Sequence, residues 1–220
     1  MAQRPPLAER VRIPGPAGDL EALIETPQDE AGAAAKVRAV AVVCHPHPLY
    51  GGTMDNKVVY TLARAFQQCA APAVRFNYRG VGASPGAYDE GRGETEDTLA
   101  VIGYARRRWP GADLWLGGFS FGGAVAVRAA GHADPRRVVL VAPAVSRIDV
   151  TAAAPPACPW LVVQGDTDEL VSRDEVLSWA RALTPTPSIA VLPATGHFFH
   201  GRINELRAAV LSFMEQTGGQ

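Results

Sequence analysis

The segment Gly118-Phe-Ser-Phe-Gly122 limits the fold of this chain more than any other part of its sequence. It forms the pattern G-x-S-x-G, with an apolar run at 114–116 before it and an alanine-rich run at 124–130 after it. A strand can turn sharply into a helix at a serine where the flanking residues are glycines, because a Cβ at either position would crowd the turn. The segment therefore predicts Ser120 at a strand-to-helix turn, with its hydroxyl clear of the backbone. The alternative interpretation is a glycine-rich turn whose serine caps the helix.

Apolar runs and helical periodicities alternate along the rest of the chain. We expect eight strands, at residues 10–13, 20–26, 37–44, 73–78, 113–118, 137–141, 160–164 and 189–192. We expect five helices, at residues 55–68, 95–109, 122–130, 174–183 and 203–214. Such alternation predicts an α/β fold, a mostly parallel eight-stranded sheet with helices on both faces. The short turn at 14–19 indicates that the first two strands are antiparallel, and the length suits a single domain, residues 1–220.

Two loops offer the groups that a serine nucleophile needs. A hydroxyl is a weak nucleophile and requires a base. His197 follows the last predicted strand, and loops at the carboxyl ends of parallel strands border the crevice in which ligands bind. His200 competes for this role but lies next to the last predicted helix. Asp168, in the loop after the preceding strand, is the predicted acid; Asp166 is the runner-up and is better explained as an Asx turn. The sequence thus predicts Ser120, Asp168 and His197 as catalytic residues.

Acyl transfer from a serine also needs N–H donors for the developing oxyanion. The backbone N–H of Phe121, the residue after the nucleophile, is the first predicted donor. The second is expected from the loop after the third strand, residues 45–50, in which two prolines have no N–H to offer. The remaining candidates are His47, Leu49 and Tyr50, of which we expect Leu49.

Two other patterns resemble parts of a metal site and of a dinucleotide site, but each lacks residues that such a site needs. His45 and His47 form an H-x-H pair, but no third ligand stands at a supporting spacing, so no metal is expected. The glycine-rich stretch 78–86 has the spacing G-x-G-x-x-x-G, contains Pro85 and opens no clear helix, which disfavours a dinucleotide site. The sequence predicts no metal and no cofactor.

The composition disfavours several classes of partner. The formal net charge is −1, which provides no field to attract nucleic acid or an anionic membrane surface. Three widely spaced cysteines argue against a disulfide framework. Residues 1–16 contain no apolar run of the length of a secretory signal, and no stretch of the chain is apolar for long enough to span a membrane. We expect a cytoplasmic monomer or small homo-oligomer that acts on a small molecule, with no nucleic-acid or membrane partner.

Four segments together resemble the α/β-hydrolase superfamily in their order and spacing. They are the serine segment 118–122, Arg79-Gly-Val-Gly-Ala-Ser84, Gly165-Asp-Thr-Asp-Glu-Leu-Val171 and Gly196-His197, and the resemblance runs from about residue 10 to residue 215. The stretch 45–57 resembles small bacterial serine esterases related to dienelactone hydrolases. The resemblance implies that the second aspartate of the G-D-x-D segment, Asp168, is the acid. Dienelactone hydrolases have a cysteine nucleophile where this chain has Ser120, so the resemblance favours a serine esterase over a lactonase.

The region in which this superfamily carries a lid is short. Residues 143–159 leave no room for a helical cap, so we expect an open site with no cap domain. Tyr50, Phe119 and Phe198 are expected to line its pocket, although aromatic residues are more often core. The predicted function is hydrolysis of carboxylic esters with short acyl chains through an acyl-enzyme. A peptidase or acyltransferase with the same three residues, and a non-catalytic binding protein on this fold, are the alternatives.

Overall fold

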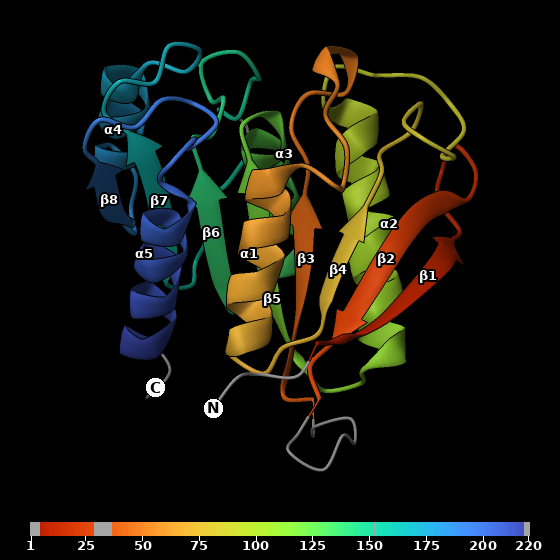
Figure 1. Cartoon of the computed structure of the whole chain (residues 1–220). Coiled ribbons are helices and arrows are strands. Elements are labelled where there is room, and N and C mark those ends of the chain that lie inside the picture. Colours follow the sequence, from red (N-terminus) through yellow and green to blue (C-terminus); the bar gives the residue numbers. More distant parts are fainter. Residues whose placement is uncertain (1–4, 29–36, 152, 218–220) are drawn as a thin grey trace.

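The computed structural model describes residues 5–28, 37–151 and 153–217, which form one eight-stranded sheet flanked by helices (Figure 1). The strands are β1 (Leu7–Ile13), β2 (Leu20–Thr26), β3 (Ala39–Cys44), β4 (Ala73–Phe76), β5 (Asp113–Phe119), β6 (Arg137–Val141), β7 (Trp160–Gly165) and β8 (Ser188–Leu192). The α-helices are α1 (Lys57–Gln68), α2 (Arg92–Arg108), α3 (Phe121–Ala133), α4 (Arg173–Arg181) and α5 (Ile203–Gln216). The strand order is β1-β2-β4-β3-β5-β6-β7-β8.

Strand direction in the sheet follows the length of the connections. The short turn after β1 returns the chain antiparallel, so that Ile13 pairs with Leu20. β2 is also antiparallel to β4, whereas every pair from β4 to β8 is parallel. The helices supply the long crossovers that parallel pairing requires. The predicted mostly parallel, eight-stranded α/β sheet is therefore confirmed.

Alternation along the central strands divides the interior into two cores. In β3, Val40 and Val42 belong to a core that also contains apolar residues of α2, α3 and α4. Ala41 and Val43, which point to the opposite face, pack with α1 and α5. Successive strand side chains point to opposite faces, so a strand covered on both sides must be apolar throughout, and all six residues of β3 are buried. Figure 1 shows α1 and α5 together on one side of the sheet.

The parallel strands deliver their following loops to one edge of the sheet. The arrows of β3 to β8 in Figure 1 all point to the upper edge, where the segments after β3, β5, β6, β7 and β8 come together. This edge is where ligands bind in open α/β sheets. The fold thus places the sequence-predicted residues of four different loops within reach of one another.

Three local features refine the predicted elements. Helix α2 begins at Arg92 rather than 95, because the Glu94 carboxylate accepts the N–H groups of Asp89 and Gly91 just before it, at 2.9 and 2.8 Å. Residues Pro48–Tyr50 form a 3-10 turn that the sequence did not predict. In the described residues between β6 and β7 there is no helix, in line with the expected absence of a cap. None of the described helices combines the length and the apolar character needed to cross a bilayer.

Candidate active site

Ser120 occupies the turn between β5 and α3 in a strained conformation. Its φ and ψ are 55° and −118°, a region that residues with a side chain rarely adopt. The surrounding backbone leaves no space for neighbouring side chains. A Cβ at Gly118 would lie 2.2 Å from the carbonyl oxygen of Gly122, and a Cβ at Gly122 would lie 2.4 Å from the carbonyl oxygen of His45. The two glycines of the G-x-S-x-G pattern are thus required by close backbone approaches.

The structure brings the three predicted side chains into one hydrogen-bonded chain. His197 Nε2 lies 3.0 Å from Ser120 Oγ, and His197 Nδ1 lies 2.8 Å from Asp168 Oδ2. A carboxylate only accepts hydrogen bonds, so Nδ1 carries the imidazole hydrogen and Nε2 is left to accept from the Ser120 hydroxyl. The side chains of His197 and Asp168 are 4% and 0% exposed. The orientation of the imidazole is therefore fixed inside the protein.

Four hydrogen bonds hold the Asp168 carboxylate. Oδ2 accepts from His197 and from Gln164 Nε2, at 3.0 Å for the latter, while Oδ1 accepts the N–H groups of Leu170 at 2.9 Å and Val171 at 2.7 Å. Burial raises the pKa of this carboxyl, but the hydrogen bonds from His197 and the two backbone groups outweigh it, so that the pKa lies below its ordinary value. Asp168 is consequently ionised at neutral pH. The sequence did not point to Gln164, whose position inside β7 looks like part of the core.

The two neighbouring carboxylates support the loop that carries His197. Asp166 Oδ1 accepts the N–H of Thr195 at 3.2 Å, and Glu169 Oε2 accepts the N–H of His197 at 3.1 Å. The predicted Asx turn at Asp166 is wrong: its carboxylate bonds across to the loop after β8, because parallel neighbours β7 and β8 place their following loops side by side. His200 is exposed and does not line the cavity at Ser120.

The predicted second oxyanion donor is corrected by the hydrogen bonds of the loop after β3. The Leu49 N–H donates to His47 Nδ1 at 3.2 Å, and the Tyr50 N–H donates to the carbonyl oxygen of His47 at 3.2 Å. Leu49 also faces solvent, because the 3-10 turn carries it away from the cavity. Among the described residues, no acceptor takes up the His47 N–H. Of the three candidates, His47 rather than Leu49 has the available N–H.

Phe121 N–H is the other candidate donor, and its position agrees with the prediction. Phe121 is the first residue of α3, where an N–H has no partner within the helix. The rings of His47 and Phe121 are 5.0 Å apart between centroids. The two free N–H groups therefore belong to residues whose rings are in contact.

His45 has a structural position. Its Nδ1 bonds to the carbonyl oxygen of Pro46 at 2.6 Å, and its Nε2 accepts the N–H of Tyr78 at 3.1 Å. The side chain is buried, and burial lowers its pKa to about 3. Both ring nitrogens are thus occupied within the protein, which leaves neither for the H-x-H pair. Among the described residues no group of three His, Cys, Asp or Glu side chains is arranged to hold a metal ion.

A cavity of about 640 Å³ opens at Ser120 and His197. Tyr50 and Phe198 line it, as the sequence predicts. Phe119 does not: it is the last residue of β5, fully buried, and its ring packs 5.0 Å from the ring of His197. The alternation of the strand turns the Phe119 side chain into the core with α1 and α5. Phe119 thus backs the imidazole instead of contacting a ligand.

The cavity has an aromatic wall and a second wall that the sequence did not reveal. The rings of Tyr50, Tyr88 and Phe121 surround that of His47, with centroids 4.7, 4.9 and 5.0 Å from it. The other wall comes from the segment after β6 and includes Ala144, Arg147 and Ile148. That segment lies at the carboxyl edge of the sheet, so its topological position was the available indication.

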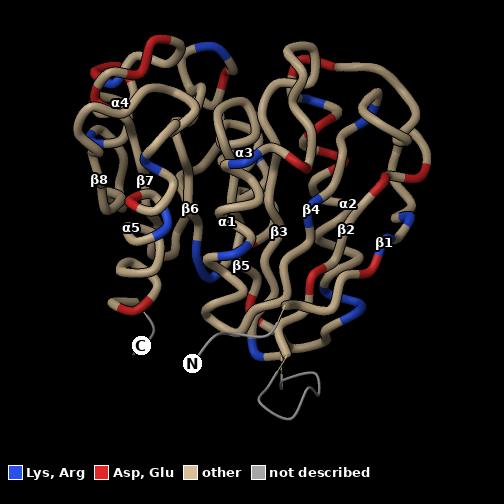
Figure 2. Tube along the Cα trace, in the orientation of Figure 1, with Lys and Arg blue, Asp and Glu red and all other residues tan. Residues whose placement is uncertain are grey.

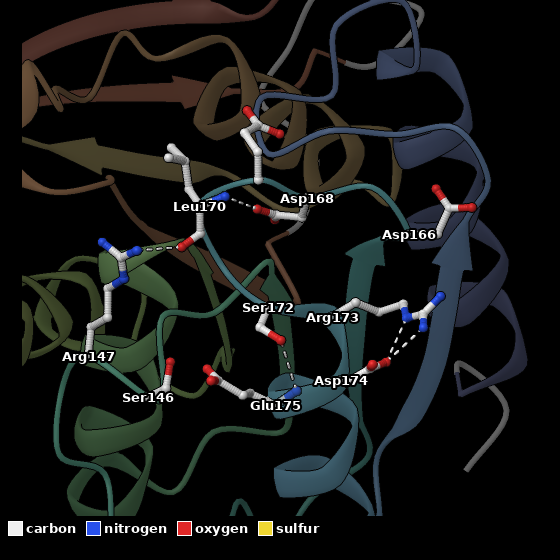
Figure 3. A pocket seen from close by; sticks show the side chains of 10 residues that line it. Ser146, Arg147, Asp166, Asp168, Leu170, Ser172, Arg173, Asp174 and Glu175 are labelled. Carbon is white, nitrogen blue, oxygen red and sulfur yellow. Dashed lines mark hydrogen bonds and ion pairs between the residues drawn. The ribbon is translucent and has the colours of Figure 1, made fainter.

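A second, polar pocket of about 560 Å³ is lined by the loop between β7 and α4, which carries Asp168 (Figure 3). Acidic residues gather between β7 and the start of α4 (Figure 2), and Asp166, Glu169 and Asp174 are among those lining the pocket. Arg147 and Leu170 line both this pocket and the cavity at Ser120. The Arg147 guanidinium donates a hydrogen bond to the Leu170 carbonyl oxygen at 2.7 Å, so the two residues that both pockets share are bonded to each other.

Comparisons with known proteins agree with this geometry. A family model described as serine aminopeptidase, S33 matches residues 35–157. The uncharacterized protein RP471 of Rickettsia prowazekii is 33% identical over 186 residues, which are 80% of this chain and 78% of that protein. The structure of XC6422 from Xanthomonas campestris, described as an α/β serine hydrolase without a lid, shares 38% identity at a TM-score of 0.90, over 98% of this chain and 97% of that one. An α/β serine hydrolase homologue from Coxiella burnetii shares 40% identity at a TM-score of 0.87, over 93% and 96%.

The fold and the comparisons define a serine hydrolase of the α/β-hydrolase superfamily. Within that superfamily the chain belongs to the family whose model it matches over residues 35–157. The closer resemblance to dienelactone hydrolases, drawn from residues 45–57, stays a prediction.

Proposed function

We propose that the protein hydrolyses carboxylic esters through an acyl-enzyme intermediate. Ser120 is the nucleophile, His197 the general base and Asp168 the group that orients the base. The observation that carries the proposal is the strained Ser120 turn with its hydroxyl 3.0 Å from His197 Nε2, at the floor of an aromatic-walled cavity. A structural capping serine needs neither the strain nor the buried imidazole.

The proposed reaction follows from the hydrogen-bonded chain. Ser120 Oγ attacks the ester carbonyl carbon while His197 Nε2 takes the hydroxyl proton, and ionised Asp168 stabilises the resulting imidazolium. The imidazolium gives its proton to the leaving alkoxide as the carbonyl carbon–oxygen bond breaks, leaving an ester of Ser120. Water, activated in turn by His197, then releases the acid and restores the hydroxyl.

Two backbone N–H groups are proposed to stabilise the oxyanion. The donors are Phe121 at the start of α3 and His47 in the loop after β3, which are in contact through their rings. Each donor of this kind contributes on the order of 10²–10³ to kcat. Because the helix N-terminus carries a partial positive charge, α3 adds to the same stabilisation.

The short chain between β6 and β7 supports a preference for small acyl groups. Its described residues, 142–151 and 153–159, form loop and line one wall, with no helix that could cover the cavity. Each methylene adds about 0.8 kcal/mol only while it leaves water, and an uncovered cavity limits how many can do so. We therefore propose short acyl chains, roughly acetate to hexanoate, as substrates.

A panel of p-nitrophenyl esters from acetate to palmitate tests the proposal, with Ser120→Ala as the control. We expect kcat/KM to peak at short chains and Ser120→Ala to lose about 10³-fold or more. A steady rise through palmitate would contradict the short-chain proposal. Retention of wild-type activity by folded Ser120→Ala would contradict the nucleophile.

Adding amide substrates to the same panel tests the alternative that the protein is a peptidase, as the description of the family model suggests. Amino-acid p-nitroanilides and the matching p-nitrophenyl esters share one acyl-enzyme, so their ratio measures how well the site expels an amine. We expect the ester to exceed the anilide by several orders of magnitude. Comparable rates would favour a peptidase.

A further inference from the structure

The cavity at Ser120 holds one permanent charge. Its lining is aromatic and apolar apart from a few polar groups, and among the described residues only one arginine, and no lysine, aspartate or glutamate, contributes to it. That arginine is Arg147, in the loop after β6. Arg147 is exposed, so a neutral ester gains little from its charge, whereas an anionic ester can pair with it.

Arg147 has no anionic partner within the described part of the protein. No aspartate or glutamate oxygen there lies within the 4.0 Å that defines an ion pair. The acids of the neighbouring pocket do not neutralise it: in Figure 3 the guanidinium turns toward Leu170, apart from Asp166, Asp174 and Glu175. Burial lowers the pKa of His47, which lines the cavity, and the positive charge of Arg147 lowers that pKa further.

Arg147 is exposed, and one hydrogen bond orients its guanidinium. One N–H of Arg147 donates to the carbonyl oxygen of Leu170 at 2.7 Å, and the Leu170 N–H donates to Asp168 at 2.9 Å (Figure 3). A guanidinium has five N–H donors in a planar fork, so four remain after the bond to Leu170. The fork matches a carboxylate with two parallel hydrogen bonds.

We infer that Arg147 determines specificity by binding a carboxylate on the substrate, so that the substrates are esters that carry a second, ionised carboxyl group. The inference rests on the proposed ester hydrolysis and narrows its substrate class. The apolar remainder of such a molecule contacts the aromatic wall of His47, Tyr50 and Tyr88, while its carboxylate reaches the opposite wall after β6.

Matched ester pairs test the inference by changing charge at nearly constant shape. Monoethyl esters of succinic, adipic and suberic acid are compared with the same esters whose free carboxyl is a primary amide. A second set carries the carboxylate in the alcohol half, as 4-butyryloxybutanoate against 4-butyryloxybutanamide. The measured quantity is the ratio of kcat/KM for the carboxylate over the amide, in wild type, Arg147→Gln and Arg173→Gln.

Arg147→Gln keeps a side-chain N–H donor but removes the charge. We expect the wild-type ratio to exceed one in at least one set, and Arg147→Gln to lower it by up to about fivefold, the range expected for an exposed ion pair. Added NaCl should lower the wild-type ratio through screening. Arg173→Gln is the control, because Arg173 pairs with Asp174 at 2.8 Å and borders only the second pocket, so the ratio should not change.

A purely structural Arg147 would give a different result. If it only ties two loops together, Arg147→Gln lowers kcat/KM for both members of a pair equally and leaves the ratio unchanged, which overturns the inference. A wild-type ratio at or below one in every pair overturns it as well. The neutral esters, in which an amide replaces the carboxylate, separate the two proposals. If their ester bond is hydrolysed and the hydrolysis depends on Ser120, the proposed function is upheld whatever the ratio. If no ester is hydrolysed in a Ser120-dependent way, both proposals are overturned.

Discussion

Replacing Asp168 with asparagine removes one charge from the site and almost no volume. Its effect follows from the four hydrogen bonds of the carboxylate. The two N–H groups of Leu170 and Val171 point at one oxygen, so the asparagine must keep its carbonyl oxygen there. Its amide NH₂ then faces His197 Nδ1 and Gln164 Nε2, where the carboxylate had accepted two hydrogen bonds.

This arrangement reverses the tautomer of His197. With a donor opposite Nδ1, the imidazole keeps its hydrogen bond only by accepting there, so the hydrogen moves to Nε2. Nε2 then cannot take the Ser120 proton, and the imidazolium formed in the reaction has no counter-charge. The loss expected from such a change is about 10⁴ in kcat, or about 5.5 kcal/mol of transition-state stabilisation.

The assay is kcat with p-nitrophenyl butyrate, read by absorbance, with thermal unfolding measured in parallel. We expect KM to change little, since Asp168 does not line the cavity. Asp166→Asn is the matched control, because within the described part of the chain Asp166 accepts one hydrogen bond, from the Thr195 N–H, and an amide oxygen can do the same. A folded Asp168→Asn variant with kcat within tenfold of wild type, or an equal loss in Asp166→Asn, would refute the reasoning.

Three further predictions follow from the same contacts. Gly122→Ala should prevent folding to a soluble protein, because the new Cβ would collide with two backbone carbonyl groups. Gly103→Ala is the control and should be neutral or stabilising, because its Cβ would meet only the tip of the Arg107 side chain. Soluble yield and melting temperature compare the two variants. The depressed pKa of Asp168 contributes stability above its unfolded pKa, about 3.9, and loses it as pH falls through the folded pKa. Urea titrations should therefore show that the difference in free energy of unfolding between wild type and Asp168→Asn becomes smaller below about pH 4. Dialysis against EDTA should leave ester hydrolysis intact; activity lost to EDTA and restored by zinc would contradict the reading of His45 and His47.

The sequence predicted those parts of the protein that depend on chain order and local pattern. Continuous apolar runs such as β3 identify strands covered on both faces, and the position after β8 identifies the loop of His197. Asp168 was preferred over Asp166 because Asp166 was assigned to an Asx turn, and the resemblance supported the same choice. The geometry gives a different reason, because Asp168 contacts the His197 ring whereas Asp166 accepts the N–H of Thr195. Parallel strands bring these loops together whatever their side chains.

The wrong assignments concern residues for which the direction of the side chain decides whether they face the cavity. Leu49 and Phe119 were both assigned to the site from their neighbourhood in sequence. The 3-10 turn at Pro48–Tyr50 carries Leu49 outward, and strand alternation turns Phe119 into the core. Arg147 was missed for the opposite reason, because nothing in a loop after β6 shows from sequence alone that its side chain borders the cavity.

The geometry of the proposed oxyanion site depends on glycine contacts more than on the donor residues themselves. The loop after β3 lies against the start of α3 because Gly122 has no Cβ to hold off the carbonyl oxygens of Cys44 and His45, at 2.5 and 2.4 Å from where that atom would be. Gly52 closes the same loop, since a Cβ there would lie 2.2 Å from the Pro46 carbonyl oxygen. Buried His45, bonded to the Tyr78 N–H, fixes the loop to the end of β4. The N–H groups of His47 and Phe121 are thereby placed before any ligand arrives, which is the preorganisation that electrostatic catalysis requires.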